Sequence, residues 1–429
     1  MKAFFKKHSQ VPRRDFLAYS AKCFLGVGLM PHLIRNTLHG KEAPIGRPSA
    51  KNVIYLYMAG GMSHLDTFDP KPGMEQQGPV ETIKTNVDGM QFTEYLPSLA
   101  RQADKLAVVR SLSSTQGAHQ QGNYFMHSSY TMRGTIRHPG LGSWLVKMDG
   151  KLNKNLPGAV RIGGSAVGGG AGFFETRYAP LVIGNPEQGL QNSKLRKGVS
   201  EGEMQQTLAL TDAFDTEFHK RYDYKLVRAY SDMYDDAVKL MKSEDLKAFD
   251  LKEEKEELRQ AYGKNSFGQG CLLARRLVEH DVRFVEVTLG GWDTHSDNFE
   301  KLPDKTKVLD DALATLLNDL ELRGMLEETM VVLATEFGRT PQINESLGRD
   351  HSPSAFSCVL AGGGIRGGQI FGHTDQIGKM VTENQVTVPD FNATIAYAVG
   401  LPIEEEYISP SGRPFTVADK GKPITQLFS

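Results

Sequence analysis

Short runs of mainly apolar residues constrain the fold of this 429-residue chain more than any other feature. The clearest run is Val53 to Met58, which ends at Gly60-Gly61. A run that is apolar at every position is typical of a strand buried on both faces, as in a parallel sheet. Further runs, apolar at most positions, lie at Leu106 to Val109, Leu181 to Ile183, Phe284 to Leu289, Met330 to Ala334 and Phe356 to Leu360. We therefore expect buried strands that open into loops.

Helical patterns alternate with these runs. Ser266 to Asp281 places its leucines on one face and its arginines on the other, and it leads directly into the run that begins at Phe284. Asp310 to Leu326 precedes the next run, and Asp390 to Val399 follows later. Alternating helices and buried strands predict an α/β protein: an α/β/α sandwich with a mostly parallel central sheet.

One segment departs from this alternation. Residues 203–262 are charged and have few strand formers, which predicts a helical insertion within an α/β domain spanning residues 46–429. Ser200 and Glu203 have the spacing of a capping box at the start of this insertion. The insertion either covers the active edge of the sheet or packs beside it.

The N-terminus has the features of an export signal. Arg13-Arg14-Asp15-Phe16-Leu17 matches the twin-arginine pattern, and a moderately apolar stretch follows to about Leu33. Residues 1–45 are therefore predicted to be a twin-arginine signal and linker, read by the Tat export machinery, which places the mature protein in the periplasm. The alternative is a basic amphipathic helix that stays on the protein. Beyond this segment no apolar run reaches the roughly 18 residues that a membrane span needs.

Composition narrows the partners and the metal chemistry. Lys plus Arg number 50 and Asp plus Glu number 51, so no overall field attracts nucleic acid. Cys23, Cys271 and Cys358 are far apart in sequence and cannot form a disulfide framework or a thiolate zinc site. Any metal site must therefore use oxygen and nitrogen ligands.

Acidic and imidazole side chains gather in the loops that follow the predicted strands. Ligands of parallel sheets bind outside the carboxyl ends of the strands, so these loops are expected to meet at one site. His64 is expected to be a ligand or an acid/base group. The expected metal ligands are Asp66, Asp293, His295, Glu336, Asp350 and His351. They would hold one or two divalent ions, with zinc, calcium, magnesium and manganese not distinguished.

Each of these residues also has a structural explanation when it is taken alone, because an Asp can cap a turn and a Glu can pair with Arg339. Arg339 and Arg349 flank the carboxylates and would either bind an anionic substrate or form salt bridges. Ser114 and Thr115 follow the second run, with His119 and His127 shortly after. Ser114 or Thr115 is the candidate nucleophile, and metal-bound hydroxide is the alternative.

With these motifs assembled, the chain resembles domain of unknown function family 1501, a group of twin-arginine-exported proteins in the alkaline phosphatase and sulfatase superfamily. The resemblance runs over nearly the whole length. It is carried by Gly60 to Lys71, Ala274 to Glu279, Gly291 to His295, Thr335 to Pro341, Gly348 to His351 and Thr374-Asp375. It implies the α/β/α sandwich of that superfamily and a metal site at the carboxyl edge of the sheet, where phosphate or sulfate esters are cleaved.

The chain departs from the superfamily in two places. The usual Asp-His pair after a late strand is Glu336-Phe337 here, and Asp350-His351 is the expected replacement. The Cys/Ser-x-Pro-x-Arg element of sulfatases is absent from the sequence. We expect an exported metal-dependent hydrolase acting on an anionic small molecule or polysaccharide. The alternative is a non-catalytic exported binding or accessory protein that keeps the fold.

Overall fold

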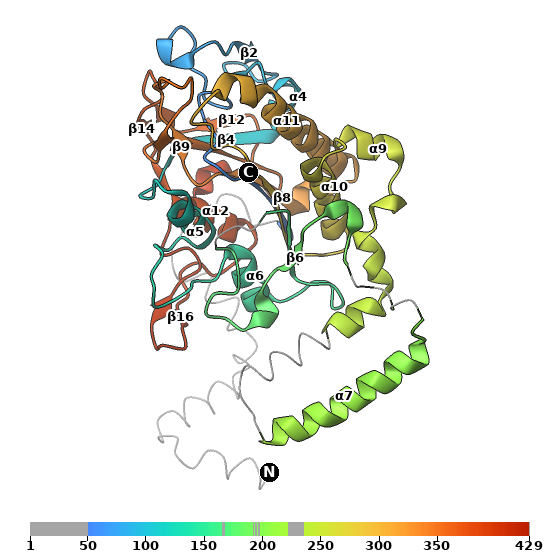
Figure 1. Cartoon of the computed structure of the whole chain (residues 1–429). Coiled ribbons are helices and arrows are strands. Elements are labelled where there is room, and N and C mark those ends of the chain that lie inside the picture. The colour runs from blue at the N-terminus through green and yellow to red at the C-terminus, as the bar shows by residue number, and fades with distance from the viewer. Residues whose placement is uncertain are drawn as a thin grey trace, which may run out of the picture. The chain divides into compact units, whose positions relative to one another are not determined.

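The computed structural model describes residues 50–428, apart from 165–167, 192, 194, 196–197 and 222–235. The predicted signal and linker at residues 1–45 lie outside the described residues. A nine-stranded sheet forms the centre of the described α/β unit (Figure 1). Its strands are β1 (Asn52–Met58), β4 (Leu106–Ser113), β5 (Ala159–Ile162), β6 (Leu181–Ile183), β7 (Phe284–Leu289), β8 (Thr329–Ala334), β11 (Phe356–Ala361), β12 (Gln369–Phe371) and β15 (Val386–Thr387).

The strand order is β12-β4-β11-β8-β1-β7-β5-β6, with β15 pairing beyond this path with β4. Strand β11 runs antiparallel to both of its neighbours, β4 and β8, and every other pair in this sheet is parallel. The predicted mostly parallel sheet is therefore confirmed. All six apolar runs of the sequence fall within its strands.

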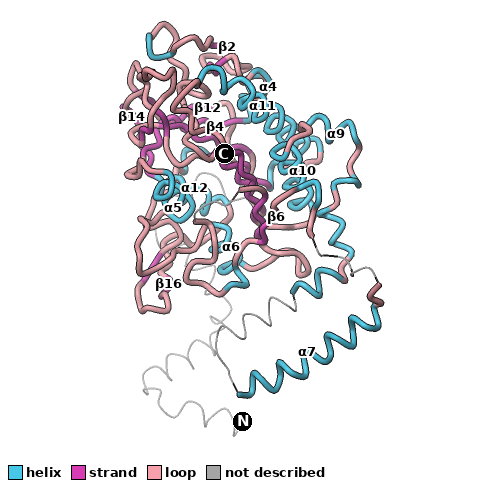
Figure 2. The backbone as a smooth tube through the Cα atoms, viewed as in Figure 1, coloured by secondary structure: helices cyan, strands magenta, loops and turns pink. Residues whose placement is uncertain are grey.

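Helices cover both faces of the sheet (Figure 2). One face packs against α4 (Pro97–Ala100), α10 (Ser266–Glu279) and α11 (Asn298–Leu322), and the other packs against α5 (His119–Ser128), α6 (Leu141–Asp149) and α12 (Val388–Ala398). Strand β1 shows why its sequence is apolar throughout: Ile54 and Leu56 lie in the first core, whereas Tyr55 and Tyr57 lie in the second. The predicted α/β/α sandwich is confirmed.

Smaller elements surround the sandwich. Four two-stranded sheets pair β2 (Thr82–Lys84) with β3 (Gln91–Thr93), β9 (Gly338–Arg339) with β10 (His351–Ser352), β13 (His373–Thr374) with β14 (Val381–Glu383), and β16 (Tyr407–Ile408) with β17 (Pro414–Phe415). In the segment expected to be a helical insertion, α7 (Glu201–Arg221) and α9 (Glu256–Ala261) are helices, as are residues 236–241. No helix in the described part of the chain is long and apolar enough to cross a bilayer.

The sheet brings three loops together. Strands β7, β1 and β8 are parallel neighbours, and Tyr57 near the end of β1 is level with Thr288 of β7 and Ala334 of β8. The loops that follow these strands therefore leave the same edge of the sheet. The β9–β10 pair places His351 opposite Arg339, so a fourth segment returns to this edge.

Candidate metal centre

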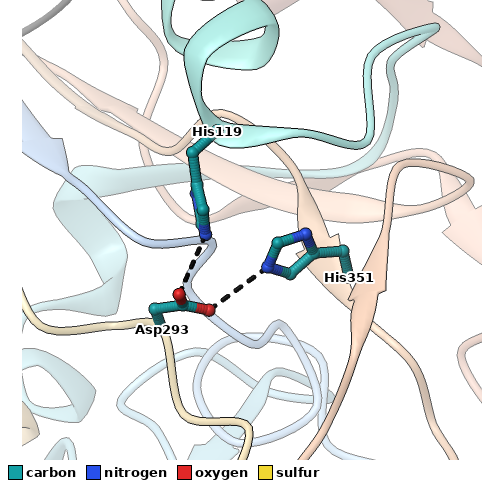
Figure 3. Close-up of side chains that lie close together, drawn as sticks. All are labelled: His119, Asp293 and His351. Atoms are coloured by element: carbon teal, nitrogen blue, oxygen red, sulfur yellow. Dashed lines mark hydrogen bonds and ion pairs between the residues drawn. The ribbon is translucent and has the colours of Figure 1, made fainter.

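His119, Asp293 and His351 converge at this edge of the sheet (Figure 3). His119 is the first residue of α5, Asp293 lies in the loop after β7, and His351 begins β10. One ligand atom from each lies within 4.8 Å of the other two. Nε2 of His119 is 3.1 Å from Oδ2 of Asp293, and Nε2 of His351 is 3.2 Å from Oδ1.

Both imidazole rings are held so that their free nitrogen faces the aspartate. Nδ1 of His119 is 2.7 Å from Oε1 of Glu336, and Nδ1 of His351 is 2.9 Å from the carbonyl oxygen of Gly117. These oxygens can only accept, so each Nδ1 carries the proton, and each Nε2 of a neutral ring has a lone pair. Two lone pairs therefore face a carboxylate that also accepts. This arrangement favours a cation between the three side chains.

His295 extends the group. Its Nδ1 is 2.7 Å from Oδ1 of Asp350, and its Nε2 lies 3.0 Å from Nε2 of His351 and 3.2 Å from Oδ1 of Asp293. Ligands bound tetrahedrally at about 2.0–2.1 Å from zinc lie about 3.3 Å from one another. The separations among the donor atoms of His295, His351 and Asp293 are close to that value, and so is the separation between His119 and Asp293. These spacings suit a zinc-type ion held by imidazole and carboxylate ligands.

Charged neighbours set the ionisation of the group. Partial burial acts to raise the pKa of Asp293, but the hydrogen bond and the charge of Arg339 outweigh it and hold that pKa far below its usual range. The hydrogen bond to Glu336 raises the pKa of His119. Burial lowers the pKa of His351. Asp293 is thus a carboxylate at any physiological pH.

Glu336 lies beneath His119 at the end of β8. Its side chain is fully buried, and its Oε1 accepts a hydrogen bond of 2.9 Å from the backbone N–H of Gly60. Burial acts to raise the pKa of Glu336, but the contact with His119 leads the effects that lower it. As placed, the carboxylate of Glu336 accepts from Nδ1 of His119 and so orients the imidazole whose Nε2 faces Asp293.

Asp66 and His64 have other partners. Arg349 holds Asp66 with two hydrogen bonds, from Nε at 2.8 Å and Nη2 at 3.0 Å, and both side chains are fully buried. Asn298 donates a third bond to Asp66. Nε2 of His64 donates to the carbonyl oxygen of Gly378 at 2.7 Å. The structure thus places Asp66 in a buried ion pair and His64 against the backbone.

Arg339 connects the loops around Asp293. Its buried guanidinium donates to the carbonyl oxygens of Gly60, Gly61 and Arg349, and to Oδ1 of Asp293 at 2.5 Å. The sequence left Arg339 and Arg349 as either anion binders or salt-bridge partners, and both form salt bridges in the structure.

Ser114 and Thr115 lie in the loop between β4 and α5. The Ser114 hydroxyl accepts a hydrogen bond from the backbone N–H of Gln116, and the exposed Thr115 hydroxyl accepts one from the Gln116 side chain. The same loop supplies the Gly117 carbonyl that binds His351. Both hydroxyls therefore belong to a loop that reaches the candidate centre.

Among the candidate ligands expected from the sequence, the structure brings Asp293, His295, Asp350 and His351 together and adds His119. His119 follows strand β4, which is separated from β1 by β11 and β8. The available signal was a histidine in the loop after an apolar run, followed by a helical segment. The sequence alone does not separate His119 from His127, which lies on the same helix. In the structure His127 pairs with Glu286 at 3.2 Å and only His119 faces Asp293.

The fold and the site define an α/β/α sandwich protein with a cluster of imidazoles and carboxylates at the carboxyl edge of its sheet. Residues 50–428 match the family described as "Protein of unknown function (DUF1501)". The chain belongs to that family. None of the curated proteins matches the sequence.

Solved structures of the sulfatase and alkaline phosphatase kind are similar to the chain at low sequence identity. The lipoteichoic acid synthase LtaP from Listeria monocytogenes is 8% identical, with a TM-score of 0.41, over 84% of this chain and 74% of that one. The PsFucS1 sulfatase from Pseudoalteromonas sp. is 13% identical, with a TM-score of 0.38, over 88% and 72%. The alkaline phosphatase from the Antarctic bacterium TAB5 is 13% identical, with a TM-score of 0.32, over 74% and 92%.

Proposed function

We propose that this chain is an exported metal-dependent hydrolase of phosphate or sulfate esters. The observation that carries the proposal is the set of lone pairs that converge on Asp293 from His119, His351 and His295. Each imidazole is held from behind by an acceptor, as metal-binding histidines are in proteins. The ester class comes from the resemblance to the alkaline phosphatase and sulfatase superfamily.

The exposure of the side chains suggests which of them hold the ion and which face the substrate. His119 and His351 are partly buried and would hold the ion together with Asp293, while His295 and Asp350 are about half exposed. An anionic ester, small or part of a polysaccharide, would therefore approach from the side of His295. A bound divalent ion would neutralise the charge that develops on the ester oxygens.

The attacking group comes from the loop before α5 or from solvent. Ser114 and Thr115 are the hydroxyls of that loop, and His351 is tied to it through Gly117. A water molecule or hydroxide is the alternative attacker, which would leave both hydroxyls dispensable. Single Ser114→Ala and Thr115→Ala variants distinguish these routes. Turnover is lost in the variant whose hydroxyl is the nucleophile, and it is kept in both variants if water or hydroxide attacks.

One observation favours the alternative of a non-catalytic exported binding protein. Arg339 and Arg349 are fully buried, and each is already paired with a carboxylate, so neither guanidinium is free to bind an anionic ester. In that alternative the ion is structural.

The location follows in either case from the twin-arginine pattern at Arg13-Arg14, which directs export through the Tat machinery to the periplasm.

Hydrolysis of aryl phosphates and aryl sulfates by the full chain, with and without a chelator, tests the proposal. We expect turnover of at least one ester class that the chelator abolishes and that added Zn²⁺ or Mn²⁺ restores. Asp293→Asn should lose this turnover, whereas Asp311→Asn, which changes an exposed helix position, should keep it. A protein that binds an ion but leaves every ester intact would favour the binding-protein alternative.

A further inference from the structure

The hydroxyl of Tyr57 contacts Glu336, the residue that in turn contacts the candidate metal ligand His119. It is 3.2 Å from Oε2 of Glu336 and also contacts the side-chain amide of Asn123. Tyr57 is fully buried in β1, and the His127 ring packs against it with centroids 4.5 Å apart. The ring therefore has a fixed position, and its hydroxyl points at the carboxylate that orients His119.

The carboxylate of Glu336 uses its two oxygens differently. Oε1 serves His119 and the backbone N–H of Gly60. Oε2 lies 3.2 Å from the hydroxyls of both Tyr57 and Thr335, but the Thr335 hydroxyl is closer to the Met58 carbonyl, at 2.8 Å, and has one proton to give. Tyr57 is therefore the remaining candidate donor to Oε2.

Tyr57 also has a single proton, and Asn123 lies on its other side. A carboxylate is the stronger acceptor, because a hydrogen bond to an ionised group is charge-assisted. The structure places the amide oxygen of Asn123 toward the Tyr57 hydroxyl. Turning this amide over presents its NH₂ group instead, so that Asn123 donates to the Tyr57 oxygen and Tyr57 donates its hydrogen bond to Glu336. Burial, followed by the charge of Glu336, raises the pKa of Tyr57 well above its usual value, so the proton stays on the hydroxyl.

The chain of contacts closes on one helix. His119 and Asn123 are four residues apart on α5 and so lie on the same face of that helix. From His119 the chain runs through Glu336 at the end of β8 and Tyr57 of β1, and it returns to α5 at Asn123. This closed series of hydrogen bonds fixes the first turn of α5 relative to the sheet.

We infer that Tyr57 is a positioning residue for the metal ligand His119, acting through Glu336. The inference rests on the metal binding of the proposed function. Without the hydroxyl, Oε2 of Glu336 loses this hydrogen bond, and the carboxylate is held less firmly against Nδ1 of His119. The ring of His119 then loses its tautomer and its orientation, and the ion is bound more weakly.

Strand β1 supplies a matched control. Tyr55 lies two residues earlier, faces the same core and stacks on Tyr57 with ring centroids 6.2 Å apart. In the described part of the chain its buried hydroxyl has no hydrogen-bond partner. Tyr55→Phe and Tyr57→Phe therefore remove the same atom from neighbouring buried tyrosines, and only the second removes a contact to Glu336.

The test is the dissociation constant for Zn²⁺, measured on the full chain by competition with a chromogenic chelator. Tyr57→Phe should weaken Zn²⁺ binding about 10-fold, the lower end of the usual effect of removing a metal ligand's own hydrogen-bond partner, because Tyr57 acts one contact further out. Tyr55→Phe should bind as the unaltered protein does. In Co²⁺-loaded protein the visible absorption should shift in Tyr57→Phe alone.

A double-mutant cycle separates positioning from general damage to the fold. If Tyr57 acts through Glu336, then Tyr57→Phe has no further effect on the Zn²⁺ dissociation constant in a Glu336→Gln background. Additive losses, or a Tyr57→Phe dissociation constant within twofold of that of Tyr55→Phe, would overturn the inference while leaving the proposed function intact. Absence of Zn²⁺ and Co²⁺ binding in the unaltered protein would overturn both.

Discussion

Two aspartates that the sequence placed in one site have different surroundings. Asp293 is about half exposed and faces imidazoles, whereas Asp66 is fully buried and carries two hydrogen bonds from Arg349. Their replacement should therefore change different properties. Asp293 is expected to matter for the ion, and Asp66 for the stability of the folded chain.

We expect Asp66→Asn to lower the free energy of unfolding by about 3–5 kcal/mol, because it leaves the buried guanidinium of Arg349 without its charge partner. Urea unfolding measures this loss. Asp311→Asn, which breaks an exposed pair with Lys307, should cost less than about 1 kcal/mol. Loss of metal from folded Asp66→Asn at unchanged stability would instead make Asp66 a ligand.

His138 gives the fold a sensitivity to acid. It is buried against the ring of Tyr130, and burial, followed by the charge of Arg133, lowers its pKa from 6.5 to about 4. Between these two values the unfolded chain binds a proton at His138 that the native protein does not. The stability contributed by neutral His138 is therefore complete above about pH 6.5 and is lost as the pH falls toward about 4.

His138→Asn should reduce this sensitivity, because the amide oxygen of asparagine can replace Nδ1 as the partner of the Tyr124 hydroxyl and does not titrate. The measurement is the urea midpoint at pH 7 and pH 4.5. We expect the midpoint of the variant to fall less between the two pH values than that of the unaltered protein. An equal fall in both proteins would exclude His138 as a source of the acid sensitivity.

At the scale of elements, the segment expected to be a helical insertion, residues 203–262, is joined to the sandwich by a buried network of charged side chains. Glu254, which follows that segment's short helical turns, accepts from Arg275 at 2.7 Å and from Arg276 at 2.5 Å, both on α10. Arg275 is completely buried and also contacts Asp319 of α11 at 2.9 Å. Glu254 thus ties the segment to α10, and Arg275 extends the network to α11.

We expect Glu254→Gln to destabilise the protein by about 3 kcal/mol, because two guanidinium groups lose a shared carboxylate with little access to water. Glu256→Gln is the matched control two residues away, since Glu256 pairs with Lys264 in an exposed salt bridge. It should leave the urea midpoint almost unchanged, because an exposed pair in water contributes little to stability. Equal effects of the two substitutions would mean that the buried network contributes nothing beyond a surface pair.

The start of α7 illustrates an element that local sequence determines. Ser200 and Glu203 form the expected capping box: the Glu203 N–H donates to the Ser200 hydroxyl at 3.2 Å, and the Ser200 N–H donates to the Glu203 carboxylate at 2.8 Å. Both partners lie within one helical turn, so their spacing alone predicts the contact. Contacts of this kind need no knowledge of the fold.

At the scale of the whole molecule, the sheet could be predicted because its strands are buried on both faces. β1 is apolar from Val53 to Met58 for that reason, and its two sets of side chains pack into separate cores. The antiparallel direction of β11 could not be predicted, because an apolar run has no direction. The short strands β12 and β15 carry too few residues for a pattern to emerge.

The sequence predicted that the site lies at the carboxyl edge of the sheet, but it did not predict which side chains contact one another there. The rule that ligands gather beyond strand ends selects Asp293, His295, Asp350 and His351, which the structure places together. The same rule cannot tell which residue faces an arginine of another loop, as Asp66 does. Such pairings depend on contacts between segments more than 200 residues apart in the chain.

The central claim is that His119, Asp293 and His351 hold one ion between them. A crystal structure of the full chain grown with Zn²⁺, with anomalous data collected at the zinc edge, tests it most directly. We predict an anomalous peak about 2.0–2.2 Å from Nε2 of His119, from Nε2 of His351 and from a carboxylate oxygen of Asp293. Ordered side chains at these three positions with no anomalous peak between them would contradict the account.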